Sequence, residues 1–130
     1  MCTHGDIRTE PAENIYFNVP CASDQTCVIR LTNISSRRIA YSVQMWTDTQ
    51  ENIPGRHYTI KPPNGVLSPY HKVLVHVSVD PFQFETNKML QDKVVIKYFE
   101  APREGDVYSD QWTLTAPVIH QKLMPVFYNW

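Results

Sequence analysis

Apolar and polar side chains alternate along several short runs of this sequence. The clearest run is Val73–Val79, in which every second residue is a valine. A period of two is the signature of a β-strand with one buried face, and no stretch shows the longer period of an amphipathic helix. The same alternation predicts strands over residues 15–19, 27–32, 39–46, 94–99 and 123–128.

Turn-forming residues separate these runs, and the chain carries ten prolines but only four glycines. Several short strands divided by turns predict an all-β fold, an antiparallel β-sandwich. A length of 130 residues accommodates one domain with a substantial core. The alternation predicts that one side chain of each pair faces inward, and the expected core is Phe17, Ile29, Leu31, Tyr41, Val43, Val75, Val77 and Ile96.

Proline and turn signals refine this prediction. Pro11 cannot donate to a strand ladder, so it belongs at an edge or where the chain changes sheets. Residues 108–113 lack alternation and are expected to form a helical turn. The expected turns are Pro20–Asp24, Asn33–Ser36, Pro62–Gly65 and Ala101–Asp106.

The charge balance argues against two classes of partner. The sequence has 12 lysine and arginine residues and 13 aspartate and glutamate residues, which gives a net charge of −1. Such a chain has no overall field for nucleic acid or an anionic membrane, and its apolar runs are too short for membrane insertion. The polar start is unlike a secretory signal, so we expect a cytoplasmic protein with free thiols at Cys2, Cys21 and Cys27. The alternation places Cys27 in the core.

The residues needed for catalysis or for metal and cofactor binding are not arranged in any recognisable motif. There is no Gly-x-Ser-x-Gly turn for a nucleophile and no glycine-rich phosphate loop. His71 and His76 lie five residues apart, which places them on opposite faces of a strand. We therefore expect no enzyme activity, no catalytic residue, no cofactor and no metal.

An immunoglobulin domain is the first sandwich to consider. Cys27 followed by Trp46 matches the beginning of its cysteine and tryptophan pattern, but no cysteine follows Cys27. The sandwich is therefore expected to be immunoglobulin-like without the disulfide that joins the sheets.

Six ordered motifs covering nearly the whole chain resemble the major sperm proteins of nematodes. They are Gly5-Asp6-Ile7-x-Thr9-x-Pro11, Ile15-x-Phe17-Asn18-x-Pro20, Asn33-x-Ser35-x-Arg37-Arg38-Ile39-x-Tyr41, Pro62-Pro63-x-Gly65-Val66-Leu67-x-Pro69, Val77-Ser78-x-Asp80-x-Phe82-x-Phe84 and Pro125-Val126-x-Tyr128-Asn129. The resemblance implies one domain over residues 1–130 with a seven-stranded immunoglobulin-like β-sandwich.

The resemblance also implies a function. Major sperm proteins form homodimers that pack into filaments without consuming nucleotide, as part of the cytoskeleton in the sperm pseudopod. By resemblance, the partner is a second copy of this chain or another protein of this type. This chain departs from the family at a polar insertion, Thr47–Arg56, and at Asn64, where the family often has cysteine. It is therefore expected to be a divergent member.

Self-association would use a sheet edge with its adjoining loops. The aromatic C-terminal end supplies a candidate contact, because aromatic side chains dominate interface hot spots. Its residues are Phe127, Tyr128 and Trp130. In the alternative reading, Phe127 packs internally and Trp130 frays.

A second functional reading comes from the same resemblance. The domain also occurs in vesicle-associated-membrane-protein-associated proteins, where one sheet face binds short acidic peptides containing two phenylalanines. Carried over to this chain, that candidate partner-binding face consists of Ser42, Gln44, Trp46, Lys93 and Val95. The related proteins carry lysines on this face, and Lys93 is the one that this chain keeps. The attraction for an acidic peptide is therefore expected to be weak, and peptide binding ranks second to self-association.

Overall fold

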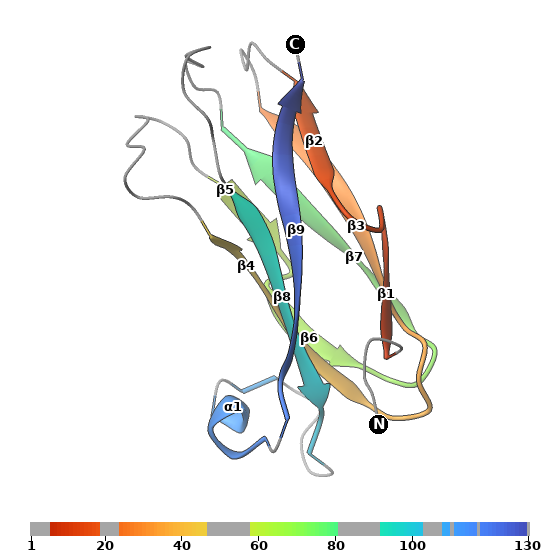
Figure 1. The fold of residues 1–130 in the computed structure, drawn as a ribbon. Coiled ribbons are helices and arrows are strands. Elements are labelled where there is room, and N and C mark those ends of the chain that lie inside the picture. Colours follow the sequence, from red (N-terminus) through yellow and green to blue (C-terminus); the bar gives the residue numbers. More distant parts are fainter. Residues whose placement is uncertain are drawn as a thin grey trace.

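A computed structural model of the chain describes residues 6–18, 24–46, 58–80, 92–102, 108–109, 111–116 and 118–129. These residues form two β-sheets that face each other (Figure 1), and one short helix, α1 (Trp112–Thr115). The four-stranded sheet has the order β1 (Ile7–Glu10), β3 (Gln25–Asn33), β7 (Lys72–Val79), β5 (Tyr58–Lys61). The five-stranded sheet has the order β2 (Ile15–Asn18), β9 (His120–Asn129), β8 (Lys93–Glu100), β4 (Ile39–Trp46), β6 (Asn64–Leu67).

The predicted β-sandwich is confirmed, with one correction to strand direction. Six of the seven neighbouring strand pairs are antiparallel, but β2 runs parallel to β9, with Ile15 opposite Val126. Both strands point toward the same end of the molecule in Figure 1. The antiparallel pairing expected from the sequence does not hold for this one pair, because the pairing partner of a strand is set by distant parts of the chain.

Two segments of the chain change sheets at a proline. Pro11 lies between β1 in the four-stranded sheet and β2 in the five-stranded sheet, and Pro62 lies between β5 and β6 in the same relation. Both prolines follow a cis peptide bond. The described residues thus form nine strands, which become seven when each interrupted pair is counted once. Pro11 sits at a sheet switch as predicted, whereas the turn expected at Pro62–Gly65 is already part of β6 from Asn64 onward.

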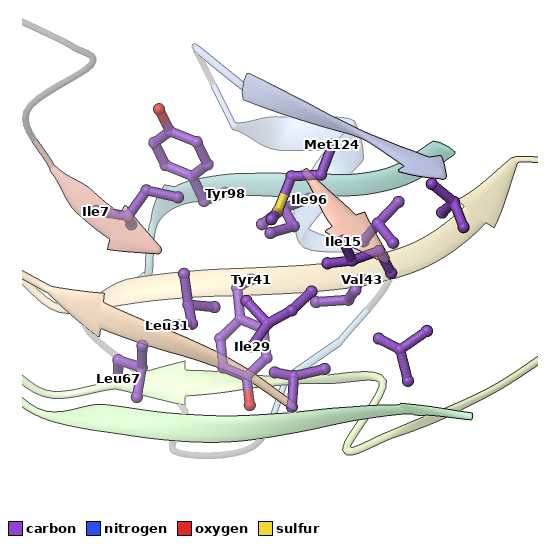
Figure 2. Packing of buried hydrophobic residues seen from close by; sticks show 14 of the residues in the cluster. Ile7, Ile15, Ile29, Leu31, Tyr41, Val43, Leu67, Ile96, Tyr98 and Met124 are labelled. Carbon is purple, nitrogen blue, oxygen red and sulfur yellow. The ribbon is translucent and has the colours of Figure 1, made fainter. Parts of the chain in front are cut away.

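The core lies between the sheets, as Figure 2 shows for ten labelled side chains. All eight residues predicted to face inward are buried. The alternation was sufficient to identify them because each strand presents one face to the opposite sheet. The structure adds buried residues that the predicted core left out, among them Ile7, Ile15, Leu67, Tyr98 and Met124.

A second apolar cluster covers part of the outward face of the five-stranded sheet. Ala40, Phe99 and Ala101 are buried there beneath Tyr108 and the partly buried Trp112 and Ala116. The helical turn expected at 108–113 is present but shifted, since α1 spans Trp112–Thr115. This cover explains why β4 and β8 carry apolar residues on both of their faces.

Cys27 differs from its prediction. It is only partly buried, beside the backbone of Tyr16 in β2. Burial raises the pKa of its thiol, and a hydrogen bond to the Tyr16 backbone opposes part of that effect. Among the described residues it is a free cysteine; Cys2 and Cys21 lie outside them.

Asn33 organises the end of β3. Its side chain is fully buried, and its Nδ2 donates to the carbonyl oxygens of Arg37, Leu67 and Ser68 at 2.7, 3.1 and 3.2 Å. Its Oδ1 accepts from the backbone N–H and the hydroxyl of Ser35 at 2.9 and 2.7 Å. A buried amide with this many partners fixes the turn between β3 and β4 against the end of β6.

Candidate functional site

The outward face of the five-stranded sheet carries the residues that sequence reasoning selected for partner binding. Strand alternation turns Gln44 and Trp46 of β4 away from the core, together with Lys93 and Val95 of β8. Strand register aligns these residues with β9 in two neighbouring rows, Gln44–Val95–Leu123 and Trp46–Lys93–Pro125. Three strands therefore present one continuous surface.

This surface contains a groove with a volume of about 360 Å³. Its wall is more apolar than polar, and the apolar side chains are unusually exposed for their size: Trp46 is 48% exposed and Leu123 is 52% exposed. Exposed apolar side chains that gather on one surface mark an interaction site more often than scattered ones do. The groove is lined by Gln44, Met45, Trp46, Lys93, Val95, Lys97, Gln121 and Leu123.

The polar side of the groove is basic. The Nζ of Lys93 lies 5.3 Å from the centroid of the Trp46 ring, within the range of a cation–π interaction. Lys97 is two residues further along β8 and lines the same groove. The two lysines give the groove a positive rim beside an apolar floor.

Four of the five residues predicted for the partner-binding face line the groove: Gln44, Trp46, Lys93 and Val95. Ser42 does not, because it lies further along β4 between Asn64 of β6 and Lys97 of β8, and only 9% of it is exposed. Its hydroxyl is therefore poorly placed to meet a partner.

The predicted face left out four residues that line the groove, Met45, Lys97, Gln121 and Leu123. Lys97 could have been found, because the alternation of β8 puts it on the same face as Lys93 and Val95. Gln121 and Leu123 could not, since their place in the groove depends on the register between β8 and β9. The earlier count of one lysine on this face was too low.

The predicted contact end is only partly described. Phe127 is exposed rather than packed internally, and it stacks on Tyr16 of β2 with ring centroids 5.6 Å apart. This aromatic pair extends the outward face beyond the groove along β9. The side chain of Tyr128 and the whole of Trp130 lie outside the described residues, as does the insertion Thr47–Arg56.

The outward face of the four-stranded sheet holds a smaller polar hollow of about 270 Å³. Its hydroxyl groups interact with each other, Thr26 Oγ1 lying 2.8 Å from Ser78 Oγ, with the exposed His76 beside them. Across the described ranges, no group of three His, Cys, Asp or Glu side chains is arranged to hold a metal ion. The one described helix, of four residues, is far too short to span a bilayer.

Comparisons with known proteins agree with this architecture. The family model of the major sperm protein (MSP) domain matches residues 6–116. Major sperm protein isoform alpha of Ascaris suum is 32% identical over 126 residues, covering 96% of this chain and 94% of that protein. Major sperm protein 49 of Caenorhabditis elegans is 30% identical over the same shares. The solved structure of WR4, a C. elegans MSP family member, has a TM-score of 0.67 at 20% identity, covering 95% of this chain and 97% of that one.

Proposed function

Since this chain belongs to the major sperm protein domain family, we propose that it is a non-enzymatic protein that associates with itself. The proposed unit is a homodimer, and its interface is the groove-bearing outward face of the five-stranded sheet. This proposal replaces the sheet edge expected from the sequence as the main contact with an adjoining face.

The single observation that supports this choice is the apolar patch that crosses three strands. Val95 of β8 and Leu123 of β9 lie in one row, and Trp46 of β4 lies in the neighbouring row on the same surface. Trp46 and Leu123 are exposed, and Val95 is half-buried between them. Aromatic and aliphatic side chains at the centre of a patch, with charged residues at its margin, are the usual composition of a protein interface. A second copy that covers these side chains removes their apolar surface from water, which stabilises the dimer by about 25 cal/mol per Å² of buried area.

A two-fold arrangement suits this surface. In such a dimer both copies contribute the same patch, so the groove of one copy receives residues from the groove of the other. The aromatic pair of Tyr16 and Phe127, further along the same face, would extend the contact. We propose assembly into filaments and a role in sperm motility as later steps after dimer formation, and the family resemblance supports them.

The experiment is sedimentation of the purified protein over a concentration series, with one charge introduced into the patch. Val95→Glu places a carboxylate in the proposed interface, where attraction to Lys93 and Lys97 offsets only part of the cost of removing it from water. The variant should therefore weaken the dimer at least tenfold, or by about 1.4 kcal/mol. Val28→Glu is the matched control, because Val28 is exposed on the outward face of the other sheet. A protein that stays monomeric, or a dimer that Val95→Glu leaves intact, would contradict the proposal.

A second candidate function gains support from Lys97. With Lys93, it provides two cations beside the apolar floor, a combination that suits an acidic peptide carrying aromatic residues. Exposed lysines contribute about 1 kcal/mol or less each in physiological salt, so we expect binding weaker than about millimolar. Titration with an acidic peptide containing two phenylalanines decides between the two readings. Micromolar binding by a strictly monomeric protein would favour peptide capture.

A further inference from the structure

The longest of the described strands, β9, has an edge that is only partly paired. β9 spans ten residues, and β2 pairs with its last four, Val126–Asn129. The first six residues, His120–Pro125, pair with β8 on one side. On their other side, no strand of the described part of the chain pairs with them.

The direction of the backbone groups along this edge follows from one hydrogen bond. The N–H of Val126 donates to the carbonyl oxygen of Asp92 at 2.9 Å, so Val126 directs its backbone groups toward the β8 side. Because backbone groups alternate along a strand, those of Gln121 and Leu123 point to the opposite side, toward the unpaired edge. Pro125 also directs its backbone toward the unpaired edge, as Gln121 and Leu123 do. The N–H that proline lacks therefore removes no hydrogen bond between β9 and β8.

The neighbouring edge of β2, unlike that of β9, is covered by side chains. The side-chain amide of Gln25 accepts from the N–H of Asn18 at 2.8 Å and donates to its carbonyl oxygen at 2.7 Å. The Cys27 sulfur is hydrogen-bonded to the backbone of Tyr16. Side chains of β3 thus occupy the edge of β2 in the way that natural sheets protect their edges from added strands.

The remaining edge strands are short. β1, β5 and β6 have four residues each, and short edge strands offer few groups for pairing. Three longer strands also have a stretch of four or more residues that pairs with a described strand on one side only: Gln25–Ile29 of β3, Val43–Trp46 of β4 and Lys72–Val75 of β7. At six residues, the uncovered half of β9 is the longest such edge in the described part of the chain, so it offers the most backbone groups to another strand. Its two flanking side chains differ in character. Leu123 is exposed on the groove side, whereas Lys122 is half-buried on the opposite face of β9, the face that carries the buried Met124.

We propose that this edge of β9 binds an extended segment of another polypeptide as an added antiparallel strand, and that apolar and acidic residues alternate in the segment. Residues that exchange backbone hydrogen bonds with Gln121 and Leu123 point their side chains to the groove side, where Leu123 favours apolar neighbours. The residue between them lies opposite Lys122, where a carboxylate is favoured.

Pairing of two β9 edges from two copies suits the edge less well. The register in which Gln121 of each copy bonds Leu123 of the other places Lys122 directly opposite its own counterpart. Like charges in directly opposed positions destabilise a strand pair. The acidic segment removes that repulsion and replaces it with attraction, so the segment is the occupant that the charges favour.

The test uses an acetylated eight-residue peptide of alternating valine and glutamate, titrated into the full chain. We expect submillimolar binding together with slower hydrogen exchange at the amides of Gln121 and Leu123. Gln121→Pro removes one edge donor without touching the β8 ladder and should weaken binding at least tenfold. Gln121→Ala, which removes the same side chain from the groove but keeps the N–H, should bind within about threefold of the unchanged protein.

The peptide provides a second control that leaves the protein unaltered. Methylation of the valine nitrogens, which face the edge in the proposed register, should abolish binding, whereas methylation of the glutamate nitrogens should preserve it. No binding up to millimolar peptide, equal loss from both methylations, or unchanged exchange at the two amides would overturn the proposal. So would concentration-dependent protection of these amides that appears without peptide and persists in the Val95→Glu variant, because it would assign the edge itself to a second copy.

Discussion

The hydroxyl of Tyr58 donates a hydrogen bond to the carboxylate of Asp92, which joins the two sheets at one end of the sandwich. Tyr58 begins β5 in the four-stranded sheet, and Asp92 immediately precedes β8 in the five-stranded sheet. Asp92 is only 1% exposed. A buried carboxylate requires donors, so this contact connects the sheets through a group that water does not reach.

Tyr58→Phe should lower the free energy of unfolding by about 1–3 kcal/mol, because it withdraws a donor from the buried Asp92 carboxylate. Urea denaturation followed by fluorescence measures the change. Tyr70→Phe is the control, since Tyr70 is exposed and should shift stability by no more than about 0.5 kcal/mol. Equal stability of the two variants would show that the contact contributes nothing.

Asn33→Ala should lower the free energy of unfolding by more than Tyr58→Phe does. The substitution removes the donor shared by three carbonyl oxygens and the acceptor used by Ser35, and we expect a loss of at least about 2 kcal/mol. Asn64→Ala, at an exposed position of β6, provides the comparison. A thermal midpoint for Asn33→Ala close to that of Asn64→Ala would argue against the role assigned to the network.

Val75→Ala and Val77→Ala should each cost about 1–3 kcal/mol, because both side chains are buried between the sheets and truncation leaves a cavity. Val28→Ala removes the same atoms from an exposed position of β3 and should cost about 0.5 kcal/mol or less. Chemical denaturation of the three variants tests the inward register of β7. Three indistinguishable midpoints would show that this register is wrong.

Cys27 should react slowly with an alkylating reagent in the folded protein. Burial raises its pKa, so at a pH below the ordinary thiol pKa of about 8.5 it holds less of the reactive thiolate than an exposed cysteine does. The measurement is iodoacetamide labelling of a Cys2→Ser, Cys21→Ser variant, folded and in urea. The rate should rise on unfolding, and a faster reaction in the folded state would reverse the predicted direction of the shift.

Local pattern was enough to predict the inward side chains, because a strand in a sandwich is buried on one face whatever its partners are. The valine alternation of β7 and the alternation of Ile15 and Phe17 in β2 are examples. The sheet switch at Pro11 was also predictable, since a residue without an N–H has few places in a sheet.

What sequence could not supply was pairing between distant segments. The parallel register of Ile15 with Val126 joins residues more than a hundred positions apart, and the groove depends on the placement of Leu123 beside Val95. Lys97 is a different case. The alternation of β8 places it on the outward face with Lys93 and Val95, so its position was predictable from the sequence.

The parallel pairing of β2 and β9 also governs how the protein responds to force. The start of β2 and the end of β9 lie at opposite ends of their shared ladder, from Ile15–Val126 to Asn18–Asn129. Tension that draws these two points apart acts along the strands, so the hydrogen bonds between them are sheared together rather than opened one after another. An antiparallel pair joined at the same two points would unzip instead. In any assembly that carries load through these strands, the four-residue ladder would act as a mechanical clamp.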